Sequence, residues 1–300
     1  MSYHVPVMLK ECIEGLEIKP EGIYVDVTFG GGGHTKEILK HIKGGKVYSF
    51  DQDEDAKANA AEIKDSSFTL IEANFRYLKR YLKVNGISQV DGILADLGIS
   101  SHQIDSAERG FSTRFDAELD MRMDRSTEKT AKEIVSTYSE KDLHRILGMY
   151  GEVTNAKTLA AAIVKARANG KINTVEEFKN AIRSLASRGK ENKYFAQVFQ
   201  ALRIEVNDEL KALEEMLVQS AEVLKPGGRL VVMSYHSLED RLVKNFIGKG
   251  LFHGEPEKDV YGNYYKPFEA LTRKPVEASE EEVEINKRAR SAKLRIAVKV

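Results

Sequence analysis

A run of four glycines between an apolar segment and a helical one is the feature of this chain that most directly indicates ligand chemistry. The segment Ile23 to Phe29 predicts a buried strand, Gly30 to Gly33 end it, and 36–43 has helical spacing. A strand, a glycine turn and a helix open a doubly wound α/β domain, which binds ligands at the carboxyl edge of its sheet. Glycine suits this turn because it accepts positive φ and lets a ligand approach the backbone.

The ligand that this turn predicts is an adenosine without phosphates. The dinucleotide pattern G-x-G-x-x-G is not completed, because its last position falls on Thr35 or Lys36, and the P-loop ending Gly-Lys-Ser/Thr is absent as well. Asp51 ends a second predicted strand, about 20 positions after the turn, where a carboxylate can accept both ribose hydroxyls. S-adenosylmethionine fits these features. The alternative is a plain tight turn with Asp51 as a solvated strand end.

The composition of the 300-residue chain allows a full core but gives no net charge. Its 46 basic and 46 acidic side chains cancel, so a global positive field cannot argue for a nucleic-acid partner. The single Cys12 excludes an internal disulfide and gives no zinc cluster, in agreement with a reducing cytoplasm. The charged N-terminus does not resemble a signal peptide, and no apolar run approaches a membrane span. We therefore expect a cytoplasmic protein with no membrane segment, and we assign no metal site.

The first hundred residues predict alternating strands and helices. A helix over 8–18 precedes the first strand, and further strands follow over 46–51, 68–73 and 90–97, with helices over 54–64 and 77–82 between them. Asp96 falls at the end of the fourth strand. This pattern is half of a doubly wound fold, with candidate ligand-binding residues at the strand ends.

From residue 130 the chain predicts helices for about ninety residues. Ser139 begins one helix, and Thr174 begins another with Glu177 as its capping-box partner. No strand signal interrupts this region. We therefore predict an inserted helical substrate-recognition domain over 105–215, within a discontinuous α/β domain over 1–104 and 216–300.

The sheet is expected to resume after the turn at 225–228, with a strand over 229–235. Ser237 is the predicted cap of the helix that follows, through Phe246. The segment 248–286 is aperiodic and is predicted to run over the surface without regular structure. Apolar and polar residues alternate over 294–300, which predicts a final strand. The basic segment 287–300 fits a solvated edge or an RNA contact equally well.

Several short motifs occur in order along nearly the whole chain: HVPVML at 4–9, DVTFGGGGH at 26–34, DLGISS at 96–101 with Gln103, ERGFS at 108–112, LDMRMD at 119–124, RI at 203–204 with VN at 206–207, Ser234 with HSLEDR at 236–241, and RARS at 288–291. Taken together, these residues resemble the bacterial small-subunit ribosomal RNA cytosine-N4 methyltransferase family, known as RsmH or MraW. Gly31 and Glu118 depart from the family pattern in a minor way, because a variable residue and a proline are expected there.

The resemblance implies a Rossmann-like class I methyltransferase sheet with an inserted all-helical subdomain. It implies methyl transfer from S-adenosylmethionine to the exocyclic N4 of a cytidine in the decoding region of 16S ribosomal RNA. The partner is then the RNA of the small ribosomal subunit. The resemblance does not decide whether the protein is a monomer or a homodimer. The cofactor-binding positions that carry over are Gly32, Gly33, His34, Asp51, Phe75, Asp96 and Gln103.

Roles in catalysis and in RNA binding are hypotheses at this point. Asp96 is expected to orient the amino group, with direct cofactor contact as its competing role. His236 is a candidate to take the released proton or to contact the base, although a structural role is the alternative. Arg109 and Arg122 are expected to clamp the RNA, unless they pair with the acidic residues around them.

Three other functions share parts of this pattern. A nicotinamide dehydrogenase has the same fold class but would complete the glycine fingerprint. A DNA cytosine methyltransferase would normally carry a proline pair and an aromatic residue after the fourth strand, where this chain has Asp96-Leu97-Gly98-Ile99. A non-catalytic ribosome-assembly factor would use the same surfaces for binding.

Overall fold

The structure is a computed structural model that describes residues 6–300, so His4 and Val5 of the N-terminal motif lie outside the described residues. The chain divides into two compact units. One, here called the sheet unit, is built from the segments Met1–Gly98 and Leu210–Val300, and the other, the helical unit, is Ile99–Glu209. Among the residues described, no helix has the length and apolarity needed to cross a membrane.

The sheet unit contains one seven-stranded sheet in the order β3-β2-β1-β4-β5-β7-β6. Strands β1 to β5 pair in parallel, while β7 runs antiparallel to both β5 and β6. The chain order reverses between β1 and β4, which is where doubly wound folds bind ligands. The strands are β1 (Ile23–Asp26), β2 (Lys46–Asp51), β3 (Phe68–Glu72), β4 (Val90–Asp96), β5 (Leu224–Ser234), β6 (Phe268–Ala270) and β7 (Lys293–Lys299).

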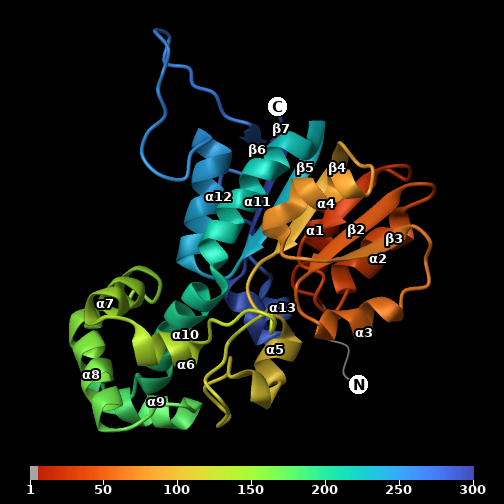
Figure 1. Ribbon diagram of the computed structural model, residues 1–300. Helices are drawn as coiled ribbons and strands as arrows, with labels where there is room; N and C mark the ends of the chain where they lie inside the picture. The colour runs from red at the N-terminus through yellow and green to blue at the C-terminus, as the bar shows by residue number, and fades with distance from the viewer. Residues whose placement is uncertain (1–5) are drawn as a thin grey trace. The chain divides into compact units, whose positions relative to one another are not determined.

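Helices cover both faces of this sheet (Figure 1). On one face, buried side chains of α4, α11 and α12 pack on alternate residues of the central strands, such as Val25 and Ile93. On the other face, α1 and α2 pack on Tyr24 and Leu94. The doubly wound fold predicted from the sequence is thereby confirmed. The helices and 3-10 turns are α1 (Leu9–Leu16), α2 (Gly33–His41), α3 (Asp55–Ala61), η1 (Phe75–Tyr77), α4 (Leu78–Val84), α11 (Glu209–Val223), α12 (Ser237–Lys249), α13 (Glu280–Ile285) and η4 (Lys287–Ser291).

Three expectations for the C-terminal part need correction. Strand β5 begins at Leu224 rather than at residue 229, because Leu224 already pairs with Val90 and the turn over 225–228 forms an irregularity within the ladder. The cap of α12 is His236 rather than Ser237. The segment 248–286 is not wholly irregular, since it contains β6 and α13, although the part between α12 and β6 does project from the sheet (Figure 1).

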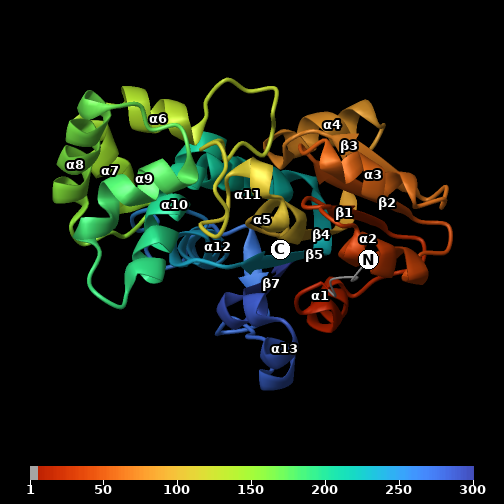
Figure 2. The same cartoon turned by 90° about the horizontal axis from the view of Figure 1, so that it is seen from below.

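The helical unit has its own apolar core, which includes Leu143, Leu159, Phe178 and Leu202. The predicted capping box between Thr174 and Glu177 is confirmed. Figure 2 shows α7, α8 and α9 gathered at one end of this unit. Its helices and 3-10 turns are α5 (Ser101–Asp105), η2 (Ala107–Arg109), α6 (Ala131–Thr137), α7 (Glu140–Met149), α8 (Ala156–Asn169), α9 (Val175–Ile182), η3 (Arg183–Leu185) and α10 (Glu191–Asn207).

Candidate active site

The glycine turn between β1 and α2 is held by Asp51 at the end of the neighbouring strand β2. The backbone N–H of Gly30 donates to Asp51 Oδ2 at 2.8 Å, and the N–H of Asp53 donates to Oδ1 at 2.9 Å. Gly32 has φ of 74°, so the turn uses the left-handed conformation that glycine adopts without strain. Asp51 therefore fixes the turn, while each carboxylate oxygen keeps a second lone pair for a ligand hydroxyl.

A second carboxylate, Asp26, lies at the end of β1 and was not predicted from the sequence as a site residue. It is only 1% exposed, and its Oδ2 accepts a hydrogen bond from the Thr35 hydroxyl at 2.7 Å. The Thr35 hydroxyl is in turn 2.7 Å from the Ser49 hydroxyl on β2. This chain of polar contacts ties the first turn of α2 to two strands. An acidic residue inside an otherwise apolar strand was the available signal for it.

Asp96, at the end of β4, lies among groups from three other segments of the sheet unit. The Tyr235 hydroxyl donates to Asp96 Oδ1 at 2.8 Å. The Asp96 backbone N–H donates to the Thr28 hydroxyl oxygen at 2.6 Å. His34 Nδ1 lies 3.8 Å from Oδ2, which is close for an ion pair but too long for a hydrogen bond. The structure thus brings His34 and Asp96 together, as expected, and adds Tyr235 as a residue that the sequence did not indicate.

Three carboxylates therefore meet at one edge of the sheet, and their charges are costly there. The pKa values of Asp51 and of Asp96 are raised from 3.8 to about 6, mainly by burial, and the neighbouring charge of Asp26 contributes to the rise in both. A cationic ligand would lower this cost, whereas the phosphates of a dinucleotide would increase it. The positively charged sulfonium and ammonium groups of S-adenosylmethionine fit an acidic edge of this kind.

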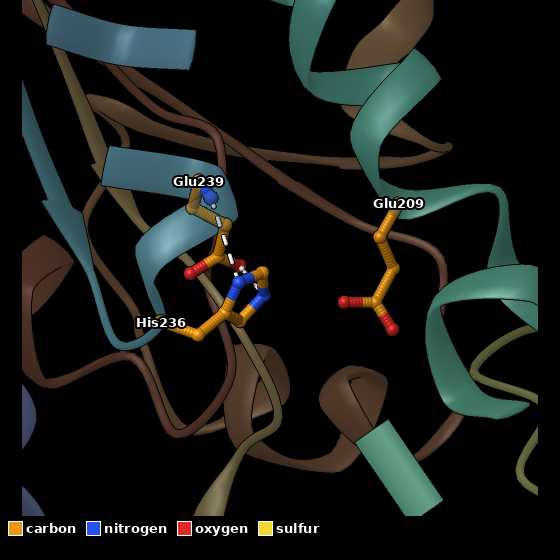
Figure 3. A group of neighbouring side chains, drawn as sticks. All are labelled: Glu209, His236 and Glu239. Atoms are coloured by element: carbon orange, nitrogen blue, oxygen red, sulfur yellow. Dashed lines mark hydrogen bonds and ion pairs between the residues drawn. The ribbon is translucent and has the colours of Figure 1, made fainter. Parts of the chain in front are cut away.

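Phe75 and His236 lie at the ends of two further strands. Phe75 follows β3 as the first residue of η1 and packs, partly buried, against the core beneath α4 and α11. His236 follows β5, and its Nδ1 accepts the Glu239 N–H at 3.5 Å as the cap of α12. Its Nε2 is 3.1 Å from Glu239 Oε1. Figure 3 shows the imidazole ring of His236 beside the Glu239 side chain. The capping contact gives His236 the structural role that was the alternative to catalysis.

The other predicted residues belong to the helical unit. Gln103 is 6% exposed, and its side chain accepts the Ser100 N–H at 3.0 Å in the capping box of α5. Arg109 is 2% exposed and donates to the Arg122 carbonyl at 3.0 Å. Arg122 itself forms two hydrogen bonds with the carboxylate of Asp120, at 2.7 and 2.8 Å. Arg109 is thus buried and Arg122 is paired within its own segment, while contact of either residue with RNA stays a prediction.

A seven-stranded sheet in this order, with β7 antiparallel, a glycine turn after β1 and a carboxylate at the end of β2, defines a class I S-adenosylmethionine-dependent methyltransferase. Comparison with known proteins agrees. The family model described as the MraW methylase family matches residues 1–300, and the chain belongs to this family. The resemblance identified from the motifs is confirmed, and the dehydrogenase alternative is wrong.

The chain is similar over its whole length to curated proteins from several bacteria. A protein of Cytophaga hutchinsonii is 65% identical over 295 residues, which is 98% of this chain and 99% of that protein. A protein of Christiangramia forsetii is 56% identical, covering 100% of this chain and 99% of its own length. A protein of Bacteroides thetaiotaomicron is 54% identical, covering 100% and 98%. Each is named ribosomal RNA small subunit methyltransferase H.

Two adjacent glycines of the turn should differ sharply when each is replaced by alanine. A Cβ on Gly32 would lie 2.8 Å from Phe29 Cζ at a φ of 74°, while a Cβ on Gly31 meets no described atom within 4 Å. We expect Gly32→Ala to lower the free energy of unfolding by about 2 kcal/mol and Gly31→Ala by less than about 0.5 kcal/mol. Urea unfolding measures both, with Gly31→Ala as the matched control. Equal losses would contradict the assigned backbone conformation.

Proposed function

We propose that this protein transfers a methyl group from S-adenosylmethionine to the exocyclic N4 of a cytidine in the decoding region of 16S ribosomal RNA. The observation that carries this proposal is the 65% identity to a ribosomal RNA small subunit methyltransferase H over 98% of the chain. The acidic edge of the sheet supports it, because buried carboxylates favour a cationic donor. The partner is the RNA of the small ribosomal subunit, which places the protein in the cytoplasm.

Asp96 is the residue that we assign to the amino group of the target base. The cofactor supplies an electrophilic methyl group, while the amino lone pair is delocalised into the ring and is a poor nucleophile. The ionised Asp96 carboxylate can accept a hydrogen bond from that amino group and align it for attack. Oδ1 is held by Tyr235, and no described residue donates a hydrogen bond to Oδ2. Oδ2 is therefore the atom that we assign to this contact.

His236 is proposed to contact the target base rather than to take the proton that the amino group loses. Because its Nδ1 accepts the Glu239 N–H as the cap of α12, the neutral ring carries its proton on Nε2, which can donate a hydrogen bond but cannot accept a proton. Nε2 is buried and forms no aligned hydrogen bond with any described residue, although Glu239 Oε1 is 3.1 Å away. A contact with the base through Nε2–H is therefore compatible with the cap.

Arginines of the segment 109–125 are proposed to serve RNA binding in two different ways. Arg109 and Arg122 hold the segment together, because their guanidinium groups bond to carbonyls and to Asp120 within it. Arg114 and Arg125 are exposed and can reach phosphates. Arg114 also lies 5.3 Å from the centre of the Phe115 ring, which is 37% exposed and offers a face on which a base can stack.

Replacing both exposed arginines, as Arg114→Gln with Arg125→Gln, should weaken binding to small-subunit RNA by about tenfold and lower the salt dependence by about 2 in the log–log slope. The reason is that each phosphate contact releases about one counterion. Filter binding over a range of salt measures this, and calorimetry should show unchanged cofactor affinity. Arg188→Gln, an exposed arginine of the same unit, is the control. An unchanged slope would contradict the phosphate contacts.

The proposed function itself is tested by incubating the protein with labelled S-adenosylmethionine and small subunits that lack the modification. We expect label in the RNA, mapped to N4 of one cytidine in the decoding region. A non-catalytic assembly factor would bind the subunit without transferring label. Label at a carbon atom or at another base would contradict the assigned specificity.

A further inference from the structure

Tyr235 joins two neighbouring strands at the edge where the carboxylates meet. Asp96 pairs with Met233 in the β4–β5 ladder, so Tyr235 comes two residues beyond the partner of Asp96, just after β5 ends. Its ring reaches Asp96 and its hydroxyl donates to Oδ1 at 2.8 Å. Its backbone N–H donates to Glu239 Oε2 at 3.0 Å, so the first turn of α12 holds the residue in place.

The direction of this hydrogen bond is fixed by the surroundings of the hydroxyl. Burial, and then the negative charge of Asp96, raise the pKa of Tyr235 far above its ordinary value. The hydroxyl therefore stays protonated near neutral pH, and it donates to Asp96 wherever that carboxyl is ionised. With the Asp96 backbone bound to Thr28 and Oδ1 bound to Tyr235, the carboxylate has one defined orientation.

We propose that Tyr235 is a positioning residue for methyl transfer: its hydroxyl holds Oδ1 of Asp96, so that Oδ2 is presented to the amino group of the target cytidine. This inference rests on the proposed function. It assigns to Tyr235 a role in orienting the acceptor without contact between the tyrosine and the base. A hydrogen bond to a charged acceptor is strong enough to select one orientation of a short side chain.

The hydrogen bond also favours the ionised form of Asp96, and this gives the inference a specific signature. The charged or titratable groups around Asp96 are His34 on α2, Asp26 on β1, Glu239 on α12 and Cys12 on α1. Asp26 and Glu239 raise the pKa of Asp96, while His34 and the Tyr235 hydroxyl lower it. Removing only the hydroxyl should therefore raise this pKa further above about 6.

The test is the pH dependence of methyl transfer to small subunits by the Tyr235→Phe variant. Activity needs ionised Asp96, so it falls on acidification, and we expect the acid limb of kcat/KM to move up by about one pH unit. Loss of ionisation should then slow the variant about fivefold at about pH 6, and the smaller loss that remains above about pH 8.5 reports the lost orientation of Asp96. The affinity for the cofactor, measured by calorimetry at about pH 8.5, should stay within about twofold of wild type.

The control is Tyr138→Phe, which removes another hydrogen bond from a tyrosine to a carboxylate, that of Tyr138 to Glu205 at 2.7 Å in the helical unit. It should leave the acid limb unmoved. A purely structural role of Tyr235 would lower activity equally at every pH, and that result overturns the inference. If the wild type itself transfers no methyl group to RNA, the proposed function fails instead. The carboxyl titration of Asp96, followed by carbon NMR, then still shows whether Tyr235 lowers its pKa.

Discussion

Asp96→Asn should make the protein more stable and nearly inactive. Burial raises the pKa of Asp96 from 3.8 to about 6, so the unfolded chain ionises this carboxyl at a lower pH than the folded chain does. The free energy of unfolding therefore falls as the pH rises from about 4 to about 6 and then stays level. At about 1.4 kcal/mol per pKa unit, the charge of Asp96 lowers the free energy of unfolding by nearly 3 kcal/mol once the pH is above about 6. The neutral amide avoids it, and urea unfolding at about pH 7.5 should show a gain of about 1–3 kcal/mol.

The loss of activity follows from the same change. An asparagine that keeps its oxygen on the Tyr235 hydroxyl turns an NH₂ group toward the substrate, where two donors then oppose each other. We expect kcat at saturating cofactor to fall about 100-fold, with a change of less than about threefold in cofactor affinity. Weakened cofactor binding with unchanged kcat would instead assign Asp96 to the cofactor alone.

Asp91 is the matched control because it lies on the same strand, β4, far from the strand's carboxyl end. Burial raises its pKa, but the hydrogen bonds from Lys225 at 2.8 Å and from the Ile23 N–H, together with the charges of Lys225 and Lys19, outweigh this and lower the pKa overall. Asp91→Asn should therefore lose stability at neutral pH, the opposite of Asp96→Asn, while methyl transfer is retained. A gain in stability in both variants would show that the pKa shifts have been assigned wrongly.

The parts of the site that the sequence predicted are those fixed by short stretches of chain. Asp51 could be assigned because a strand end, a glycine turn and the spacing between them are all local signals. The strand–turn–helix units and the capping box at Thr174 are local in the same sense. The contact that the sequence did not indicate depends on residues far apart in the chain. Tyr235 and Asp96 are 139 residues apart, and their meeting needs the register of β4 with β5.

Other features that the sequence did not predict have the same physical origin. Arg109 is buried, and its guanidinium donates hydrogen bonds to the carbonyls of Arg122 and Met123. Nothing in the residues next to Arg109 in the sequence indicates these partners. The observed cap of α12, His236, comes one residue before the predicted cap, Ser237. The position at which β5 ends decides which of the two precedes the helix. In contrast, α13 carried a readable signal. Its cap Ser279 accepts the N–H of Glu282 at 3.2 Å, a capping pattern visible in the sequence.

Asp51→Asn should weaken cofactor binding by about 100-fold, which corresponds to about 2.7 kcal/mol. The charged carboxylate accepts the N–H groups of Gly30 and Asp53 and is proposed to accept the ribose hydroxyls as well. An amide has only one oxygen for these donors, and hydrogen bonds to an ionised acceptor are the stronger ones. Calorimetry with S-adenosylmethionine measures the affinity. Glu54→Gln, an exposed neighbour, is the control and should bind as the wild type does.

The release of protons when S-adenosylmethionine binds tests whether the ribose hydroxyls bind at Asp51. Burial raises its pKa to about 6 in the free protein, so a fraction of the molecules carry a proton there near neutrality. Ribose hydroxyls that donate to the carboxylate favour its ionised form, so binding should release protons between about pH 5.5 and 6.5. Calorimetry in two buffers with different ionisation enthalpies counts these protons. We expect release from the wild type and from Glu54→Gln, and a clear reduction for Asp51→Asn. Equal release from all three proteins would mean that the hydroxyls do not bind at Asp51.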